Sequence, residues 1–361
     1  MDLKEGCEEN AALFAEELAK RVISGVEVNP LEVIGDEEIA LTLRNGDYRE
    51  LAKRMFFEMI ATVREVITQI KENQHADVRK LKRLLQKAIH LIANDESILL
   101  GLATIKNYEG YLYNHSVNVA IYSLAMGKRL GFARDDLTEL GMAALLHDIG
   151  KLKIPKEILD KPATLSEGER GLTERHPVMG VEILLNLKQL GEVNPRLLIG
   201  IFDHHLKNDL SGYPKLYRKR RVSLFGRIIQ IADSYDAMTT PKSYKKVPYT
   251  PEEALSMMLK KGVVHFDPIL LKGFVGLVGI YPVGSLVFLD TREKGIVYKT
   301  NPDPKWMDRP TVILISQNGH GDIKKETVDL TEMDGEGHFK RSVVRTLEPN
   351  QYDITITKYF L

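Results

Sequence analysis

The sequence predicts a mainly α-helical protein with a small antiparallel β module at its C-terminal end. Over most of the first 281 residues, apolar residues recur every three or four positions, as on the buried faces of amphipathic helices. After Tyr281, short runs rich in Val, Ile and Leu alternate with Gly, Pro and Asp, which is typical of strands joined by turns. We therefore expect a mostly helical region over 1–96, a helical central domain over 97–281 and the β module over 282–361.

The composition is that of a soluble globular protein with its own core. Of 361 residues, 43% are hydrophobic and 28% charged, and the formal net charge is zero. Nothing at the level of the whole chain favours a nucleic-acid polymer or an anionic membrane as partner. The single cysteine, Cys7, excludes an internal disulfide framework and suits a reducing compartment. With no signal peptide and no uninterrupted apolar span, we expect a cytoplasmic protein.

The region before residue 97 shows helical periodicity without a catalytic motif. A first apolar stripe covers 11–24, and two stronger ones follow from Tyr48 onward. We interpret the stripes as helix packing, and we expect the region to serve as a regulatory or dimerisation module, giving a homodimer or a contact for signalling proteins. The two stronger stripes are Leu51, Met55, Met59, Val63 and Val66, followed by Leu81, Leu84, Leu85, Ala88 and Ile92.

The central helices carry histidines and aspartates at their ends and on their apolar faces. The apolar stretch 141–146 ends in His147-Asp148, and we expect Asp135 or Asp136 to cap this helix and Gly150 to stop it. Other helices supply similar side chains. The full set is His115, His147, Asp148, His176, His204, His205 and Asp233.

A shared metal centre explains this set better than independent structural roles. Each buried imidazole or carboxylate needs a partner, and one centre satisfies all of them at once. The donors are imidazole and carboxylate without thiolate, which suits Fe, Mn, Zn, Co or Ni and disfavours Ca or a dedicated Mg site. The set is too large for one tetrahedral ion, so we expect two divalent ions bridged by a carboxylate. Such a pair activates a hydroxide for attack on a phosphodiester, which predicts phosphoester hydrolysis.

The motifs resemble a known family. HDIGK at 147–151, followed by IP at 154–155, resembles the HD superfamily of metal-dependent phosphohydrolases. The resemblance covers 97–281 and implies an HD-type all-helical bundle as the catalytic domain. It further implies hydrolysis of cyclic di-GMP to pGpG or GMP, or of cyclic GMP-AMP as in some relatives. The motifs that narrow it to the HD-GYP domain are NHSVNVA at 114–120, HPVMG at 176–180, HH…SGYP at 204–214, ADSYDAM at 232–238 and HFDP at 265–268.

The resemblance also assigns roles to residues. Lys151 matches the lysine that faces the scissile phosphate, and Tyr213 matches a substrate-lining position. Lys242 stands where the family has an arginine that contacts phosphate, and Lys245 lies nearby. Fe or Mn is the metal the resemblance favours. One ion is assigned His115, His147, Asp148 and Asp233, and the other Asp148, His176, His204 and His205.

Several positions depart from the family pattern. Leu206 replaces a glutamate that would orient imidazoles, and Leu210 replaces a glycine, so we expect a rearranged backbone there. Lys242 keeps the charge of an arginine but loses its bidentate fork. Tyr111 replaces a glutamate that recruits a third ion, which predicts two metals. The basic run at 217–221 is either a solvated face or a rim that attracts phosphates.

These departures leave three interpretations open. The first is an active cyclic-dinucleotide phosphodiesterase, because all seven ligand positions are retained. The second is a catalytically weak receptor or scaffold that holds the dinucleotide and signals through other regions. The third is a hydrolase of another phosphoester.

Overall fold

The computed structural model describes residues 48–72, 76–94, 96–104, 111–187, 194–218, 220–241, 248–301, 303–317, 323–347 and 352. Some sequence predictions fall outside these residues: the helix over 11–24, the contacts of Lys242 and Lys245, and the end of the β module at 348–351 and 353–361. Among the described residues, no helix combines the length and the apolar character needed to cross a bilayer.

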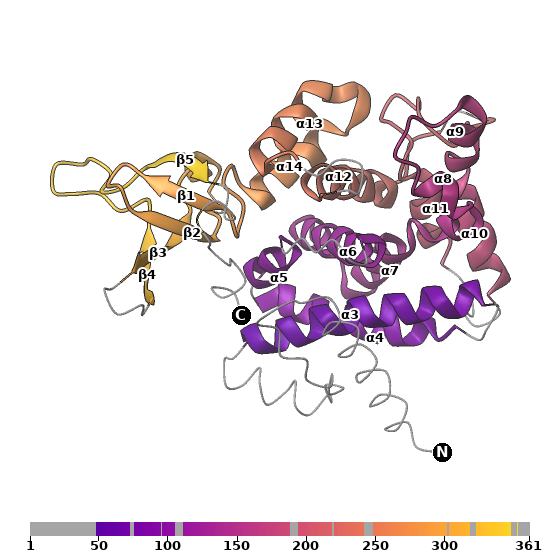
Figure 1. Cartoon of the computed structure of the whole chain (residues 1–361), viewed down its shortest axis with the longest axis horizontal. Coiled ribbons are helices and arrows are strands. Elements are labelled where there is room, and N and C mark those ends of the chain that lie inside the picture. Colours follow the sequence, from indigo (N-terminus) through magenta and orange to yellow (C-terminus); the bar gives the residue numbers. More distant parts are fainter. Residues whose placement is uncertain are drawn as a thin grey trace, which may run out of the picture.

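Helices fill the described chain up to Val278, and a sheet follows them, as the sequence predicts (Figure 1). The helices are α3 (Tyr48–Lys71), α4 (Val78–Asn94), α5 (Glu96–Ala103), α6 (Tyr111–Arg129), α7 (Arg134–Leu146), the 3-10 turn η1 (Ile149–Lys153), α8 (Lys156–Leu159), α9 (Glu167–Thr173), α10 (His176–Asn186), α11 (Pro195–Asp203), α12 (Leu224–Thr239), α13 (Pro251–His265) and α14 (Pro268–Val278). The remaining elements are β1 (Leu286–Leu289), β2 (Lys294–Lys299), η2 (Pro304–Trp306), β3 (Thr311–Gln317), β4 (Ile323–Asp329) and β5 (Val343–Leu347).

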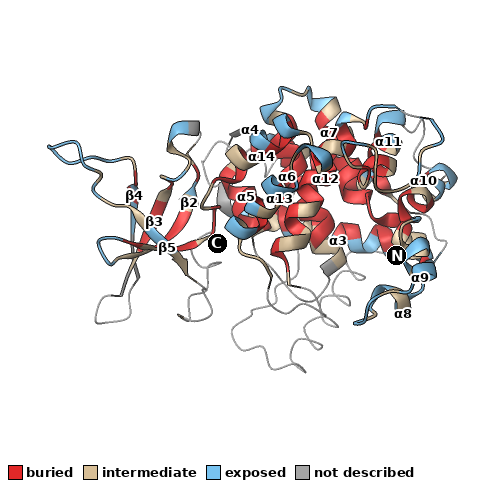
Figure 2. Cartoon of the chain, turned by 90° about the horizontal axis from the view of Figure 1, so that it is seen from above, coloured by how far each residue is buried: buried red, intermediate tan, exposed pale blue. Residues whose placement is uncertain are grey.

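Helix α6 lies at the centre of the helical body. Every residue from His115 to Met126 is buried, and a helix buried on all sides must be surrounded by others. It contacts α3, α7 and α12, so it lies between the α3–α4 pair and the α12–α14 group in Figure 1. Figure 2 shows the buried residues gathered along the facing sides of these helices. Because His115 lies on this helix, one of the predicted metal ligands is at the centre of the bundle.

The N-terminal helices share this core. All ten residues of the two stripes predicted in α3 and α4 are buried, and they belong to the same apolar cluster as α6 and α7. Helix α4 packs closely on α7, because a Cβ added to Gly141 would lie 2.8 Å from a methyl carbon of Leu85. The division at residues 96 and 97 stays a prediction, and the described helices on its two sides pack in one core.

Two local predictions around α7 are wrong. The N-cap of α7 is Ala133, and no side chain caps the helix; Asp135 and Asp136 lie in its first turn, where their charges favour the positive end of the helix dipole. Gly150 does not stop the helix but lies in η1. A Cβ on Gly150 would lie 1.9 Å from the carbonyl oxygen of His176, so glycine is required there by the contact between η1 and α10.

The C-terminal module is a five-stranded antiparallel sheet in the order β4-β3-β2-β1-β5. Alternate strand residues bury the two faces: Val287, Val297 and Val312 on one, and Leu286 and Ile296 on the other. The sheet follows α14 through a short connection. The predicted β module is confirmed.

Candidate metal centre

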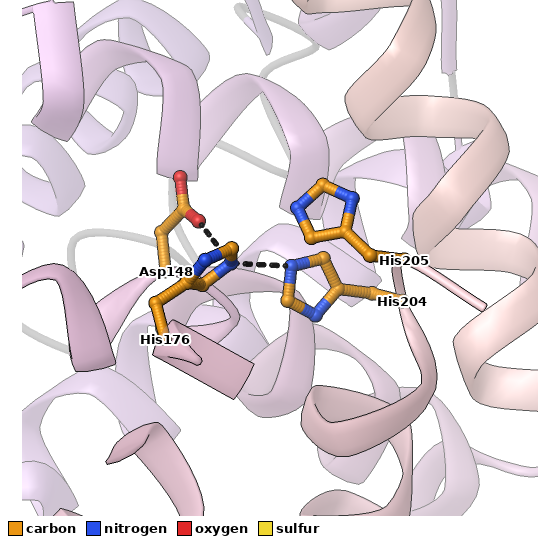
Figure 3. A group of neighbouring side chains, drawn as sticks. All are labelled: Asp148, His176, His204 and His205. Atoms are coloured by element: carbon orange, nitrogen blue, oxygen red, sulfur yellow. Dashed lines mark hydrogen bonds and ion pairs between the residues drawn. The ribbon is translucent and has the colours of Figure 1, made fainter. Parts of the chain in front are cut away.

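Five elements direct polar side chains toward one point in the helical body. His115 comes from α6, Asp233 from α12 and the other ligands from helix ends, where backbone direction changes and side chains can converge. All are buried except His205, which is partly exposed. Figure 3 shows four of them facing one another: Asp148, His176, His204 and His205.

The converging side chains form two clusters that share one residue. Potential ligand atoms of Asp148, His176, His204 and His205 all lie within 4.8 Å of one another, and so do those of His115, His147 and Asp148. Asp148 belongs to both clusters.

The two carboxylate oxygens of Asp148 face different clusters. Its Oδ1 lies 3.3 Å from Nε2 of His176. Its Oδ2 lies 3.4 Å from Nε2 of His147 and 3.9 Å from Nε2 of His115. A carboxylate placed in this way can give one oxygen to each of two ions.

Asp233 lies beside the cluster of His115 and His147. Its Oδ1 is 3.1 Å from Nε2 of His115 and 3.9 Å from Nε2 of His147. Its Oδ2 is 3.9 Å from Nδ1 of His205. The structure thus brings all seven predicted ligand residues together.

Backbone carbonyls fix the orientation of three histidine rings. In each, Nδ1 lies within hydrogen-bond distance of the carbonyl three residues earlier, and a carbonyl can only accept, so Nδ1 carries the proton. The neutral ring then directs the lone pair of Nε2 into the centre. The pairs are His147 with Ala144 at 2.8 Å, His176 with Thr173 at 2.8 Å and His204 with Ile201 at 2.6 Å.

The site fits divalent cations. Nε2 of His147 and Oδ1 of Asp148 are buried and have no hydrogen-bond partner in the part of the chain that the structure describes. Nε2 of His176 lies 3.2 Å from Nε2 of His204, which brings two lone pairs face to face. A cation satisfies these atoms together, and nitrogen and oxygen donors without thiolate suit Fe, Mn, Zn, Co or Ni.

At His204, His205 and Asp148, electrostatics favour the protonation states of metal ligands. Burial lowers the pKa of His204 well below its ordinary value and lowers that of His205 to about 3, so both rings are neutral near pH 7. Burial alone would raise the pKa of Asp148, but Lys151 and His147 outweigh it and hold that pKa well below the usual range. Neutral imidazole and ionised carboxylate are the forms that bind metal.

Asp236 and Asn118 hold the ring of His115. Nδ1 of His115 donates to Oδ2 of Asp236 at 2.7 Å, and Asn118 donates to the other oxygen at 3.0 Å. Burial works to lower the pKa of His115, but the hydrogen bonds to Asp233 and Asp236 raise it to about 9. The sequence placed Asp236 on one helix with Asp233 but gave it no role. The available signal was a spacing of three residues. Asp236 follows Asp233 by three residues and Asn118 follows His115 by three, so each lies on the same helix face as a predicted ligand.

Lys151 and Tyr213 border the centre. Nζ of Lys151 lies 2.5 Å from Oδ2 of Asp148, and the ring of Tyr213 lies 4.6 Å from that of His205. Tyr213 follows Gly212, which has φ 105°; a Cβ there would lie 2.4 Å from the carbonyl oxygen of His205. Glycine is therefore needed for the loop to pass this close to the histidine pair.

The departures from the family pattern have distinct structural outcomes. Leu206 is fully buried, and its carbonyl accepts a hydrogen bond from Gln230. The rearrangement expected at Leu210 is wrong, because Leu210 keeps the left-handed conformation with φ 66°. Arg220, from the basic run, forms an ion pair with Asp203 that sequence reasoning missed. The side chain of Tyr111 lies outside the described residues.

A family model described as "HD domain" matches residues 88–270, about half of the chain. The chain belongs to the HD domain family. This agrees with the motifs, and it extends the match into α4, ahead of the predicted catalytic region. The His147-Asp148 pair at the end of α7 is the pair that the sequence resemblance identified.

Curated relatives of the chain include cyclic-dinucleotide phosphodiesterases. The chain is 33% identical to the cyclic di-GMP phosphodiesterase PA4108 of Pseudomonas aeruginosa, over 75% of this chain and 64% of that protein. It is 35% identical to the 3'3'-cGAMP-specific phosphodiesterase 2 of Vibrio cholerae, over 44% of this chain and 30% of that protein. The chain thus spans less than two thirds of the length of these relatives.

A solved structure supports the fold. Bd1817, a HDG"Y"P protein from Bdellovibrio bacteriovorus, superimposes with a TM-score of 0.51 at 18% identity, covering 67% of this chain and 80% of that one.

Proposed function

We propose that this chain is a metal-dependent phosphodiesterase that hydrolyses cyclic di-GMP to pGpG or GMP. The observation that carries the proposal is the position of Asp148, whose two oxygens face the two ligand clusters. Two bound divalent ions, which we expect to be Fe or Mn, would supply Lewis-acid activation of water and of the phosphoryl oxygens. The names of the curated relatives support a cyclic dinucleotide as substrate.

The residues of the chain would hold the ions and handle the charge and the proton. His115, His147 and Asp233 would hold one ion and His176, His204 and His205 the other, and Asp148 would contribute to both. Lys151 lies on the partly exposed side of the centre, with 28% of its side chain accessible, so its ammonium can meet a phosphate from solvent. There it would stabilise developing negative charge or protonate the leaving oxygen.

Tyr213 and two lysines would contact the substrate. The Tyr213 ring covers His205 and is itself partly exposed, which suits a side chain that lines the entrance. Lys242 and Lys245 would pair with phosphate oxygens of the dinucleotide, with point charges in place of the fork of an arginine.

Anaerobic metal analysis combined with substrate incubation tests the proposal. Purified protein loaded with Mn(II) or Fe(II) should contain two ions per chain and convert cyclic di-GMP to a linear product. Asp148→Ala should lose both ions and abolish turnover, because it removes one ligand from each cluster. Asp135→Ala, which removes an exposed carboxylate from α7, should retain both properties. Two ions retained in Asp148→Ala would refute the bridging role.

A receptor without turnover is the second candidate. The buried Leu206 favours it, because the family places a carboxylate at this position and the core of this chain leaves none there. The same incubation separates the two: tight binding of cyclic di-GMP and of cyclic GMP-AMP, with no product from either, would establish the receptor.

We further propose that the chain forms a homodimer and that it works in the cytoplasm, where conditions are reducing enough to keep iron as Fe(II). Light scattering coupled to size exclusion checks the stoichiometry, and a mass of one chain would refute the dimer.

A further inference from the structure

The carboxylate of Asp203 is fully buried directly before the histidine pair. Asp203 is the last residue of α11, and His204 and His205 follow it. Arg220 donates to both carboxylate oxygens, through Nη1 at 2.8 Å to one and through Nη2 to the other. The backbone N–H of Ser223 donates to it at 2.8 Å. These donors supply what a buried carboxylate requires.

Asp203 also lies against the first turn of α12. Ser223, which donates to it, is the N-cap of α12. A Cβ added to Gly226 would lie 2.4 Å from the Cβ of Asp203, so only glycine permits this approach. Asp233 lies about two turns further along the same helix. The junction at Asp203 therefore joins the two helices that present His204, His205 and Asp233.

A second tether holds the chain on the other side of the histidine pair. The side-chain amide of Gln230, on α12, donates to the carbonyl of Leu206 at 2.9 Å. His204 and His205 thus lie between two attachments to α12, one at residue 203 and one at residue 206. Of the two, the attachment at Asp203 depends on a side chain from outside α12, Arg220.

We infer that the ion pair of Asp203 and Arg220 positions His204 and His205 relative to Asp233 and thereby sets the affinity of the metal centre. The inference rests on the proposed function. Without Arg220, the backbone N–H of Ser223 is the one remaining donor to this carboxylate among the described residues, and an uncompensated buried charge moves toward water. That movement displaces the histidines that follow it. Arg220 therefore does more than contribute to a solvated basic face: 40% of its side chain is exposed, but its guanidinium pairs with a buried carboxylate.

Metal titration of matched variants tests the inference. Arg220→Met removes the guanidinium and keeps an apolar stem, and Arg220→Lys keeps the charge without the fork. Arg218→Met is the control, since Arg218 is exposed two residues away and forms no ion pair with any described residue. The dissociation constant for Mn(II) is measured by competition with a chelator, and the absorption spectrum of the Co(II) form reports coordination geometry.

Arg220→Met should weaken Mn(II) binding by about 10-fold to 100-fold and change the Co(II) spectrum. Arg220→Lys should recover part of both, and Arg218→Met should match the wild type. Wild-type affinity and spectrum in Arg220→Met would overturn the inference and leave the proposed function intact. A wild-type chain that binds no metal would overturn the proposed centre itself.

A double variant covers the case in which Arg220→Met does not fold. Asp203→Asn combined with Arg220→Met removes the buried charge together with its partner, so it should fold. Weakened metal binding in the double variant supports positioning by the ion pair. Wild-type affinity in the double variant would show that the pair is structural only.

Discussion

His176 and His204 direct their Nε2 atoms at each other across 3.2 Å, while each Nδ1 contacts a backbone carbonyl. Both rings are therefore oriented before any ion arrives, with two lone pairs in opposition. Opposed lone pairs repel, so binding of a cation between them removes a repulsion as well as forming bonds. Without a cation, this repulsion raises the free energy of the folded state, and a bound cation would remove it.

Metal removal should therefore destabilise the folded protein. Adding Mn(II) to chelator-treated protein, at about 100 times its dissociation constant, should raise the free energy of unfolding by about 2.7 kcal/mol. His204→Leu should show a much smaller increase, and His338→Leu, an exposed histidine of the β module, should behave like the wild type. Urea unfolding measures all three. Equal stability with and without Mn(II) in the wild type would contradict a folded-state metal site.

Introducing the family carboxylate at Leu206 should harm the protein. Leu206 is fully buried, and a charge placed there without a partner costs several kcal/mol. Leu206→Glu should therefore unfold at a much lower urea concentration at pH 7, and Leu206→Met, which conserves volume, should cost less than about 1.5 kcal/mol. A Leu206→Glu protein of wild-type stability with faster turnover would show instead that the new carboxylate reaches a histidine.

Glycine at Leu210 should be better tolerated than alanine. The backbone of Leu210 has φ 66°, and a side chain in the left-handed region costs about 1–2 kcal/mol that glycine does not incur. Leu210→Gly should be about 1 kcal/mol more stable than Leu210→Ala, the reverse of the usual order of these residues. Urea unfolding of the metal-free proteins compares them. The usual order, with alanine the more stable, would mean that the loop adopts another conformation in solution.

Stability should depend on pH through Glu58 in α3. Burial raises the pKa of Glu58 against the opposing effects of Lys87, Lys80 and Arg54. Because the folded state binds the proton more tightly, protonated Glu58 favours folding, and this contribution is lost as pH rises through the folded pKa. Glu58→Gln should therefore melt at a higher temperature than the wild type at pH 8, with the difference shrinking toward pH 4.

Thermal melts of metal-free protein at several pH values measure this effect. Glu72→Gln, an exposed glutamate directly after α3, is the control and should change the melting temperature little at any pH. A Glu58→Gln difference that is the same at pH 4 and pH 8 would assign the effect to packing.

The parts of the fold that the sequence predicted are those that depend on local pattern. The stripes from Leu51 to Ile92 are buried because periodicity alone decides which side of a helix faces a core. The N-cap predicted for α7 at Asp135 or Asp136 was wrong, because an acidic pair in the first turn of a helix resembles a capping residue in sequence.

Contacts between distant segments could not be predicted in this way. His115 and Asp236 are 121 residues apart, and only the fold brings them together. Arg220 belongs to a run of basic residues, and the sequence of that run does not show which members face water and which one pairs with a buried carboxylate. The conformation of Leu210 is imposed by the loop around it, against the preference of the residue. The ligand residues were found because several motifs pointed to one chemistry.

The contact of Leu85 with Gly141 has a consequence for how an input could reach the metal centre. Gly141 lies six residues before His147 on the same rigid helix, and α4 presses on it directly. A displacement of α4 would therefore be passed to a ligand with no linker or hinge between them. For the same reason, a chain shortened to begin at residue 97 would leave the α4 side of α7 open to water. Truncation at residue 97 would therefore not separate the proposed regulatory region cleanly from the proposed catalytic domain.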